Sequence, residues 1–194
     1  MKMLLSVYCS GSIAKGAGDE KKICWTRTEK EQVRKAAHPH DVVFLNPDDP
    51  IVDPGNVLGQ FGRDMYQVMV ADAVIVDARE RRGLGIGVEL AAAVAMGTPV
   101  IVVAPRNSKY RLDELHYRGV TVTDYVHPHV ASLATHVVES FHDAGRYLAR
   151  AVTEKKKPAR LPQWLDSAIT EYRDNVLPHD QPMLAARKRL ALAK

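Results

Sequence analysis

Short runs rich in valine and isoleucine alternate along this chain with stretches of helical periodicity, and this alternation most constrains the fold. The runs typical of β-strands span residues 3–9, 41–45, 73–77, 99–104 and 120–125. The helical stretches span residues 28–37, 59–71, 85–96, 112–118 and 130–152. Because successive strands joined through helices run parallel, the alternation predicts a parallel sheet with helices on both faces. We expect an α/β, doubly wound fold with five strands in the order 2-1-3-4-5.

Two glycine-rich turns follow the first and third predicted strands. They are SGSIAKG at residues 10–16 and GLGIGVE at residues 83–89. In the predicted strand order the winding reverses between these two strands, and ligands bind beyond their carboxyl ends. Glycines let backbone N–H groups approach a ligand closely, and a turn that opens a helix favours anions. The sequence therefore predicts one anion site between the two turns, with Glu89 on the opening turns of the following helix.

The first turn matches neither of two common phosphate-binding motifs. Gly11 and Gly16 have the spacing of a P-loop, but Ala17 stands where that motif requires lysine. The dinucleotide fingerprint GxGxxG should follow the first strand, where Gly11-Ser12-Ile13 interrupts it. We therefore expect no P-loop ATP hydrolysis, and we predict no cofactor.

Three segments carry a resemblance to a known family. They are YCSGSI at residues 8–13, LGIGVEL at residues 84–90, and Asp64 followed by ADAVIV at residues 71–76. In this order they resemble the 2'-deoxynucleoside 5'-phosphate N-hydrolases of the nucleoside 2-deoxyribosyltransferase superfamily. The resemblance spans about residues 3–105. It implies hydrolysis of an N-glycosidic bond, and a dimer or higher homo-oligomer in which a neighbour helps to close the site.

The resemblance also implies roles for individual residues. Glu89 would attack the sugar C1' and form a covalent glycosyl-enzyme, Asp64 would protonate the leaving base, and Tyr8 would orient the nucleophile. A pair of carboxylates suits this chemistry, because the bond breaks through an oxocarbenium-like state while the leaving group needs a proton. The candidate residues for binding the substrate and its 5'-phosphate are Gly11, Ser12, Ile13, Lys15, Gly83, Gly85 and Arg82.

Two positions depart from the family pattern and leave alternatives open. Gly83 stands where the hydrolases carry serine and the transferases aspartate, and Ala14 stands where the hydrolases carry arginine. Lys15, Arg81 or Arg82 could supply the missing cation. A base-exchanging 2-deoxyribosyltransferase and a nucleotide-sensing module without turnover stay alternatives. The sequence does not decide the base, the sugar or the need for a phosphate.

Each candidate also has a purely structural interpretation. Glu89 could be a carboxylate favoured by the helix dipole, Asp64 a solvated helix residue, Tyr8 a core residue and Ser12 an N-cap. The arginines at 79, 81 and 82 fit a solvated charge run, and Trp25 fits either packing or stacking on a base. The histidine pairs at 38/40 and 127/129 lack a neighbouring cluster with ligand spacing, so we predict no metal.

Composition narrows the partners and divides the chain. Residues 1–150 hold 18 basic and 18 acidic side chains, whereas the remaining 44 residues hold 9 and 5. We therefore expect a domain over residues 1–152 and a linker with a basic helical extension over 153–194. The basic pI describes the extension, and we infer no nucleic-acid partner from it. Two cysteines without a CxxC motif and no long apolar run predict a cytoplasmic protein that does not span a membrane.

Overall fold

The computed structural model describes residues 2–13, 25–49, 53, 55–80, 83–156 and 161–193. Within them a five-stranded, fully parallel sheet has the order β2-β1-β3-β4-β7. Its strands are β1 (Leu4–Ser10), β2 (Asp41–Leu45), β3 (Ala73–Asp77), β4 (Val100–Val103) and β7 (His136–Val138). The predicted doubly wound order is confirmed, with β7 as the fifth strand of the sheet.

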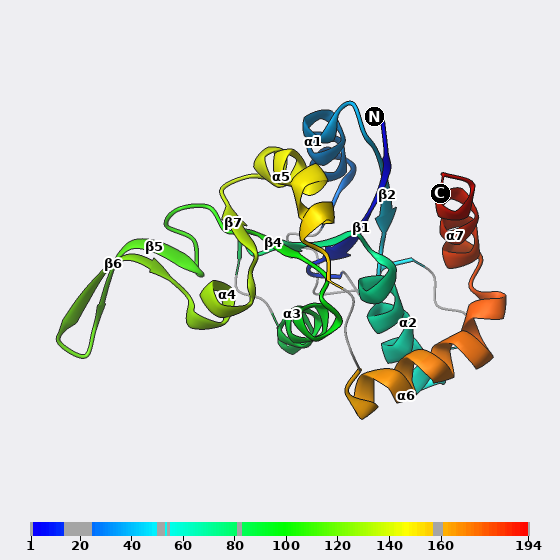
Figure 1. Ribbon diagram of the computed structural model, residues 1–194. Coiled ribbons are helices and arrows are strands. Elements are labelled where there is room, and N and C mark those ends of the chain that lie inside the picture. Colours follow the sequence, from blue (N-terminus) through cyan, green and yellow to red (C-terminus); the bar gives the residue numbers. More distant parts are fainter. Residues whose placement is uncertain are drawn as a thin grey trace.

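Helices cover both faces of this sheet (Figure 1). One face carries α1 (Arg27–Ala37) and α5 (Phe141–Glu154), and the other carries α2 (Val57–Val70), α3 (Leu84–Met96) and α4 (Pro128–Leu133). Strand residues alternate between the two layers, so that Ile75 packs with the first group while Val74 and Val76 pack with the second. Both sides of each central strand are thereby buried, which explains the near-continuous apolar runs.

The prediction for residues 112–125 is wrong. Residues 112–118, expected as a helix, form β5 (Arg111–Tyr117), and the expected fifth sheet strand is β6 (Val120–Val126) of a separate antiparallel hairpin. Both turn residues have positive φ, 51° at Arg118 and 78° at Gly119. Such a two-residue turn matches the twist of paired strands, so the hairpin outcompetes the weak helical spacing of Leu112 and Leu115. The hairpin projects from the body of the molecule (Figure 1).

The single helix predicted over residues 130–152 is also wrong. The chain instead forms α4, then β7, and then α5. Ser140 separates the last two, because its side chain accepts a hydrogen bond from the Asp143 backbone N–H and caps the start of α5. The apolar run before this cap is therefore free to add the short strand β7 beside β4.

The C-terminal segment packs closely onto α2. It comprises α6 (Gln163–Glu171), the irregular helical turns η1 (Tyr172–Val176) and η2 (Leu177–His179), and α7 (Gln181–Ala193). A Cβ atom at Gly62 would lie 1.9 Å from the Ala168 carbonyl oxygen, and one at Gly59 would lie 2.5 Å from Val176 Cγ2. Both glycines of α2 thus permit an approach that no side chain would allow. The division of the chain at residue 152 stays a prediction.

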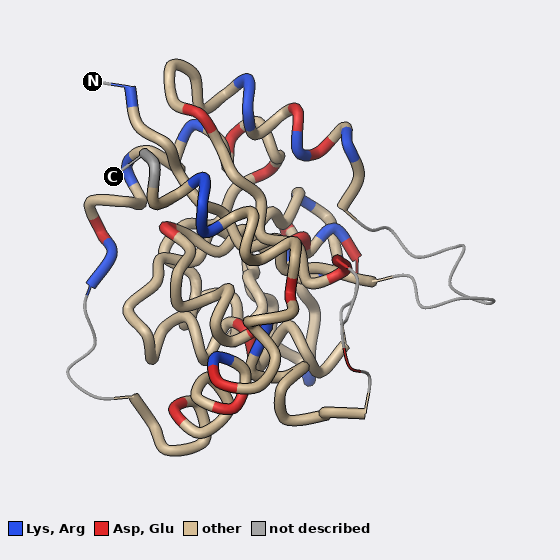
Figure 2. Tube along the Cα trace, turned by 90° about the vertical axis from the view of Figure 1, so that its right-hand side faces the viewer, with Lys and Arg blue, Asp and Glu red and all other residues tan. Residues whose placement is uncertain are grey.

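Charge is mixed over the described trace, where Lys and Arg alternate with Asp and Glu (Figure 2). The same view places the two termini on one side of the molecule. None of the helices in the described part combines the length and apolarity needed to cross a membrane.

Candidate active site

The carboxylate of Glu89 is held by two hydroxyl groups from β1. Tyr8 and Ser10 lie two residues apart on this strand, so both side chains face the layer that contains α3. Tyr8 Oη donates a hydrogen bond to Glu89 Oε1 at 3.1 Å, and Ser10 Oγ donates one to Oε2. Each carboxylate oxygen is therefore oriented by its own donor, which fixes the carboxylate at the carboxyl edge of the sheet.

The surroundings of Glu89 bring its titration close to neutral pH. The pKa of Glu89 is raised to about 7, chiefly because burial disfavours the charged carboxylate. The hydrogen bonds from Ser10 and Tyr8 oppose this rise, and the nearby charge of Asp64 adds to it. Burial also raises the pKa of Tyr8 well above its usual range, with additional effects of Glu89 and Asp64. Tyr8 therefore keeps its proton and acts as a hydrogen-bond donor to the carboxylate.

Asp64 supplies a second carboxylate from a different helix. It is a partly buried residue of α2, and its charge raises the pKa of both Glu89 and Tyr8. This influence of Asp64 on both groups indicates that it lies near them, because interactions between charges weaken with distance and with screening by solvent. The structure thus brings together the three residues that the sequence predicts as catalytic, Tyr8, Asp64 and Glu89, from β1, α2 and α3.

The first glycine turn begins directly beneath an indole ring. A Cβ atom at Gly11 would lie 2.8 Å from Trp25 Cδ1, so only glycine fits there without a shift. Trp25 Nε1 donates a hydrogen bond to the Ser10 carbonyl oxygen at 2.9 Å, and the ring packs edge-on against Phe141 with centroids 4.7 Å apart. Trp25 is thus a packing residue that supports the turn. Ser12 and Ile13 follow in the described chain, whereas Lys15 lies outside the described residues.

The second glycine turn leaves the start of α3 open. Gly83 is the N-cap of this helix and has no side chain with which to cap it. Within the described residues, a Cβ atom at Gly83, Gly85 or Gly87 would meet nothing within 4 Å. The backbone N–H groups in the first helical turn of α3 are therefore accessible to an anionic ligand. Arg82, the other predicted cation, lies outside the described residues.

Arg79 is not part of a solvated charge run. Its guanidinium group pairs with Asp77, with Nε and Oδ1 2.9 Å apart, and with Glu29, with Nη1 and Oε1 2.9 Å apart. It also lies over the ring of Phe141, 4.9 Å from the centroid. Because Asp77 and Glu29 both pair with it, Arg79 links β3 to α1. Its side chain is therefore a structural contact near the first glycine-rich turn.

Ser10 is the site residue that the sequence reasoning missed. In the sequence it appears only as the first residue of the glycine-rich turn. Strand alternation could have found it, because a hydroxyl two residues after Tyr8 must lie on the same face of β1. Whether that face meets Glu89 depends on how α3 packs on the sheet, which periodicity does not tell.

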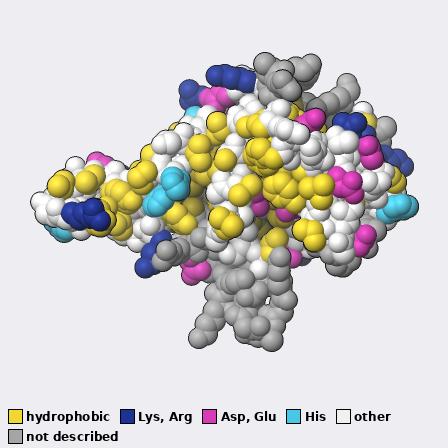
Figure 3. All heavy atoms as spheres, turned by 90° about the horizontal axis from the view of Figure 1, so that it is seen from below, with side chains coloured by type: hydrophobic (Ala, Val, Ile, Leu, Met, Phe, Trp, Pro, Cys, Tyr) yellow, Lys and Arg dark blue, Asp and Glu magenta, His cyan; other side chains and the backbone are white. Residues whose placement is uncertain are grey.

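A large apolar cavity lies beside α3. It has a volume of about 1200 Å³ and is lined by α3 residues such as Leu84, Gly87 and Ala91 together with residues from other regions. The end of β3 and the residue after it contribute Val76 and Ala78, α2 contributes Phe61, α6 contributes Trp164, and the hairpin base and α4 contribute Tyr110, His127, Val130 and Leu133. Figure 3 shows apolar side chains gathered over this face of the molecule. Glu89 and Tyr8 do not line the cavity, but Gly83 and Val88 do, so it reaches the open start of α3 and the residue next to the candidate carboxylate.

The two histidine pairs do not assemble a metal centre within the described part of the chain. There, no group of three His, Cys, Asp or Glu side chains could hold a metal ion. His127 and His129 instead pack edge to face, with ring centroids 5.2 Å apart.

Several solved structures are similar to this chain, among them two 2-deoxyribosyltransferases. No protein-family model matches the chain, and no curated protein matches it. A 2-deoxyribosyltransferase from Leishmania mexicana is 22% identical with a TM-score of 0.49, over 75% of this chain and 97% of that one. A 2-deoxyribosyltransferase from the psychrotolerant bacterium Bacillus psychrosaccharolyticus is 17% identical with a TM-score of 0.48, over 80% and 99%. The chain is thus structurally similar to 2-deoxyribosyltransferases at low sequence identity.

Proposed function

We propose that this protein hydrolyses the N-glycosidic bond of a nucleoside or deoxynucleoside 5'-monophosphate to a free base and a sugar phosphate. The observation that carries the proposal is the carboxylate of Glu89, oriented by Tyr8 and Ser10, with the second carboxylate of Asp64 close by. The motif resemblance of residues 8–13, 64–76 and 84–90 supports the same chemistry. The open start of α3 offers backbone donors for the 5'-phosphate.

The reaction proceeds in two displacements at the sugar C1'. A carboxylate oxygen of Glu89 forms a bond to C1' as the bond from C1' to the base nitrogen breaks, and the bonding electron pair leaves with the base. Asp64 delivers the proton that neutralises the departing base. Water then attacks C1', releases Glu89, and yields its proton to Asp64, so the enzyme returns to its starting state.

Hydrolysis is favoured over base exchange in this proposal because of Gly83. The transferases of the resembled superfamily carry aspartate at that position, six residues before the nucleophile, and Gly83 has no side chain to replace it. This chain therefore lacks the carboxylate that the base-exchanging transferases carry, and water is the proposed acceptor of the sugar. The two reactions are distinguished by adding a second free base to half of the base-release assays. If release requires the added base, the proposed hydrolase is a transferase instead.

The test measures base release by chromatography from ribo- and deoxyribonucleosides and their 5'-monophosphates. We expect Glu89→Gln to lose release by roughly three orders of magnitude or more while substrate binding persists. Glu31→Gln is the matched control, because Glu31 is a half-exposed residue of α1 that pairs with Arg34. Undiminished release by Glu89→Gln would refute the mechanism. Ligand binding without release in the native protein would replace the enzyme by a nucleotide sensor.

The proposal includes a homo-oligomer and a cytoplasmic location. The apolar face over α3 supports the former, because Leu84 is 89% exposed and Trp164 46% exposed beside the large apolar cavity. Exposed apolar patches of this kind mark interaction surfaces. Sedimentation of the purified protein tests the oligomer, and a monomer at all concentrations would remove it. The location stays a prediction from the use of cysteine.

A further inference from the structure

Asp180 of the C-terminal segment forms a buried ion pair with α2. Its Oδ2 accepts hydrogen bonds from Arg63 Nε at 2.5 Å and from Tyr172 Oη at 2.9 Å, and its Oδ1 accepts one from the Met183 backbone N–H at 3.0 Å. The side chains of Arg63 and Asp180 are 3% and 1% exposed. Such a pair is shielded from water and salt, and the loss of one partner would leave an uncompensated buried charge, so the two elements depend on each other more than across a surface pair.

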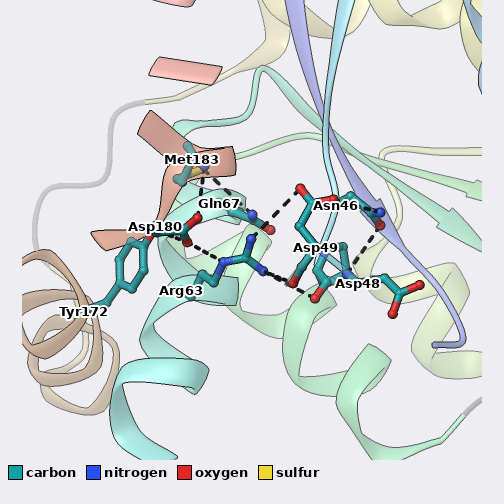
Figure 4. A network of polar contacts seen from close by, with 9 residues as sticks. Asn46, Asp48, Asp49, Arg63, Gln67, Tyr172, Asp180 and Met183 are labelled. Atoms are coloured by element: carbon teal, nitrogen blue, oxygen red, sulfur yellow. Dashed lines mark hydrogen bonds and ion pairs between the residues drawn. The ribbon is translucent and has the colours of Figure 1, made fainter. Parts of the chain in front are cut away.

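The same arginine also holds the loop that follows β2. Arg63 Nη1 donates hydrogen bonds to the carbonyl oxygens of Pro47 and Asp49, each at 3.4 Å, and Nη2 lies 4.0 Å from Asp49 Oδ2 (Figure 4). Within the loop, Asn46 bonds to the Asp48 backbone N–H and to the Asp49 carboxylate. Since β2 is parallel to and paired with β1, this loop leaves the sheet at the edge where Ser10 and Glu89 meet.

Arg63 is also the residue directly before Asp64. The two are consecutive in α2, so any displacement of the Arg63 backbone moves Asp64 with it. Gly59 and Gly62 press the same helix against the C-terminal segment, which leaves little room for independent movement. One guanidinium group therefore couples three parts of the molecule, namely the segment 161–193, the helix that carries Asp64, and the loop 46–49.

We propose that Asp180 and Arg63 are positioning residues of the active site, through which the C-terminal segment sets the place of Asp64 and of the loop 46–49. This inference rests on the proposed function, because it assigns the segment a role in the same glycosidic chemistry. Small displacements of a catalytic group have large kinetic effects, so the ion pair need not touch the substrate to matter.

The first experiment replaces Asp180 by asparagine and uses Asp174→Asn as the control. Asparagine keeps the size and the acceptor for Met183 N but removes the charge that attracts Arg63. Asp174 is an exposed residue of the same segment. We expect kcat/KM for base release to fall about tenfold in Asp180→Asn and to stay unchanged in the control.

A shift of the pH profile separates positioning from a general loss of stability. The charged and hydrogen-bonding groups that face Glu89 are Tyr8 and Ser10 on β1 and Asp64 on α2. If Asp64 moves away from Glu89, the repulsion that raises the pKa of Glu89 weakens. The acidic limb of kcat/KM should then move to lower pH in Asp180→Asn. A tenfold loss with an unmoved limb would contradict the positioning role.

Hydrogen exchange tests the coupling without any activity. Asp180→Asn should accelerate exchange in peptides that cover residues 46–49 and 57–70 as well as in 161–193. Acceleration confined to 161–193 overturns the proposal. If the native protein releases no base, the proposed function fails and the catalytic role of the pair fails with it, while the exchange result still reports whether the three parts are coupled.

Tyr172→Phe replaces the first variant if that one does not fold. It removes one hydroxyl donor from Asp180 and leaves the ion pair in place. We expect a smaller loss of kcat/KM, about threefold, with the same pattern of accelerated exchange. Native exchange in the loop 46–49 together with native kcat/KM would overturn the proposal.

Discussion

Two carboxylate clusters of this protein differ in what compensates their charge. The carboxylate of Asp180 is paired with the guanidinium group of Arg63, whereas the described hydrogen bonds to Glu89 come from the neutral hydroxyls of Tyr8 and Ser10. A buried carboxylate paired with a cation serves as a structural contact, because removal of either partner leaves an uncompensated buried charge. A buried carboxylate that hydroxyls orient, next to a second carboxylate, keeps a raised pKa and a capacity to react. The charge of the neighbouring group thus distinguishes the structural cluster around Asp180 from the candidate active site around Glu89.

The largest predicted effect is a loss of stability when Arg63, the cation of the buried ion pair with Asp180, is replaced. Arg63→Met leaves the carboxylate of Asp180 buried without a positive partner, so the free energy of unfolding should fall by about 3–5 kcal/mol. Urea denaturation followed by circular dichroism measures this loss. Arg34→Met on the exposed part of α1 is the control and should change little. Equal stability of the two variants would remove the distinction between the clusters.

A second effect concerns the stability of the reactive cluster at different pH values. Because the pKa of Glu89 is about 7 in the folded protein against 4.5 ordinarily, the folded state holds this proton more tightly than the unfolded chain. The stabilisation is complete below about pH 4.5 and is lost as the pH rises through 7. Glu89→Gln lacks this titration, so its unfolding free energy should gain roughly 2–3 kcal/mol relative to the native protein over that interval. A constant difference between the two proteins across the interval would mean that Glu89 titrates normally.

The smallest predicted effect is a shift in the pKa of Glu89 when one of its two neighbours, Ser10 or Asp64, is replaced. Ser10→Ala removes a hydrogen bond that lowers the pKa of Glu89, so that pKa should rise by about one unit. Asp64→Asn removes a charge that raises the same pKa, so that pKa should fall. Carbon-13 NMR of the labelled carboxyl group measures both, with the Glu89→Gln spectrum identifying the signal. Shifts in the same direction would show that one of the two neighbours is not where the structure places it.

The sequence predicted those parts of the fold that depend on local pattern. The four strands β1 to β4 and the helices α1, α2 and α3 lie within a few residues of their expected bounds, because long apolar runs and helical periodicity are local signals. The fifth sheet strand and the hairpin were missed for different reasons. The three residues of β7 carry little periodicity, and the hairpin depends on two positive-φ turn residues, Arg118 and Gly119, more than on side-chain spacing.

The candidate site could be predicted in part for the same reason. Glu89 follows from the glycine-rich turn after β3 and from the winding of the sheet, whereas Tyr8 and Asp64 follow from the motif resemblance. Ser10 and the pair of Arg63 with Asp180 could not be found in this way. Arg63 and Asp180 are 117 positions apart, and no periodicity or motif links them.

The sequence by itself determined that strands and helices alternate, and hence that two glycine-rich turns meet at one edge of a parallel sheet. Local conformational preferences and the handedness of strand connections suffice for this. Only the tertiary structure decided which polar groups face one another. The energy of a hydroxyl or a guanidinium group beside a carboxylate depends on distance and burial in space, and these arise when α2, α3 and the C-terminal segment pack together.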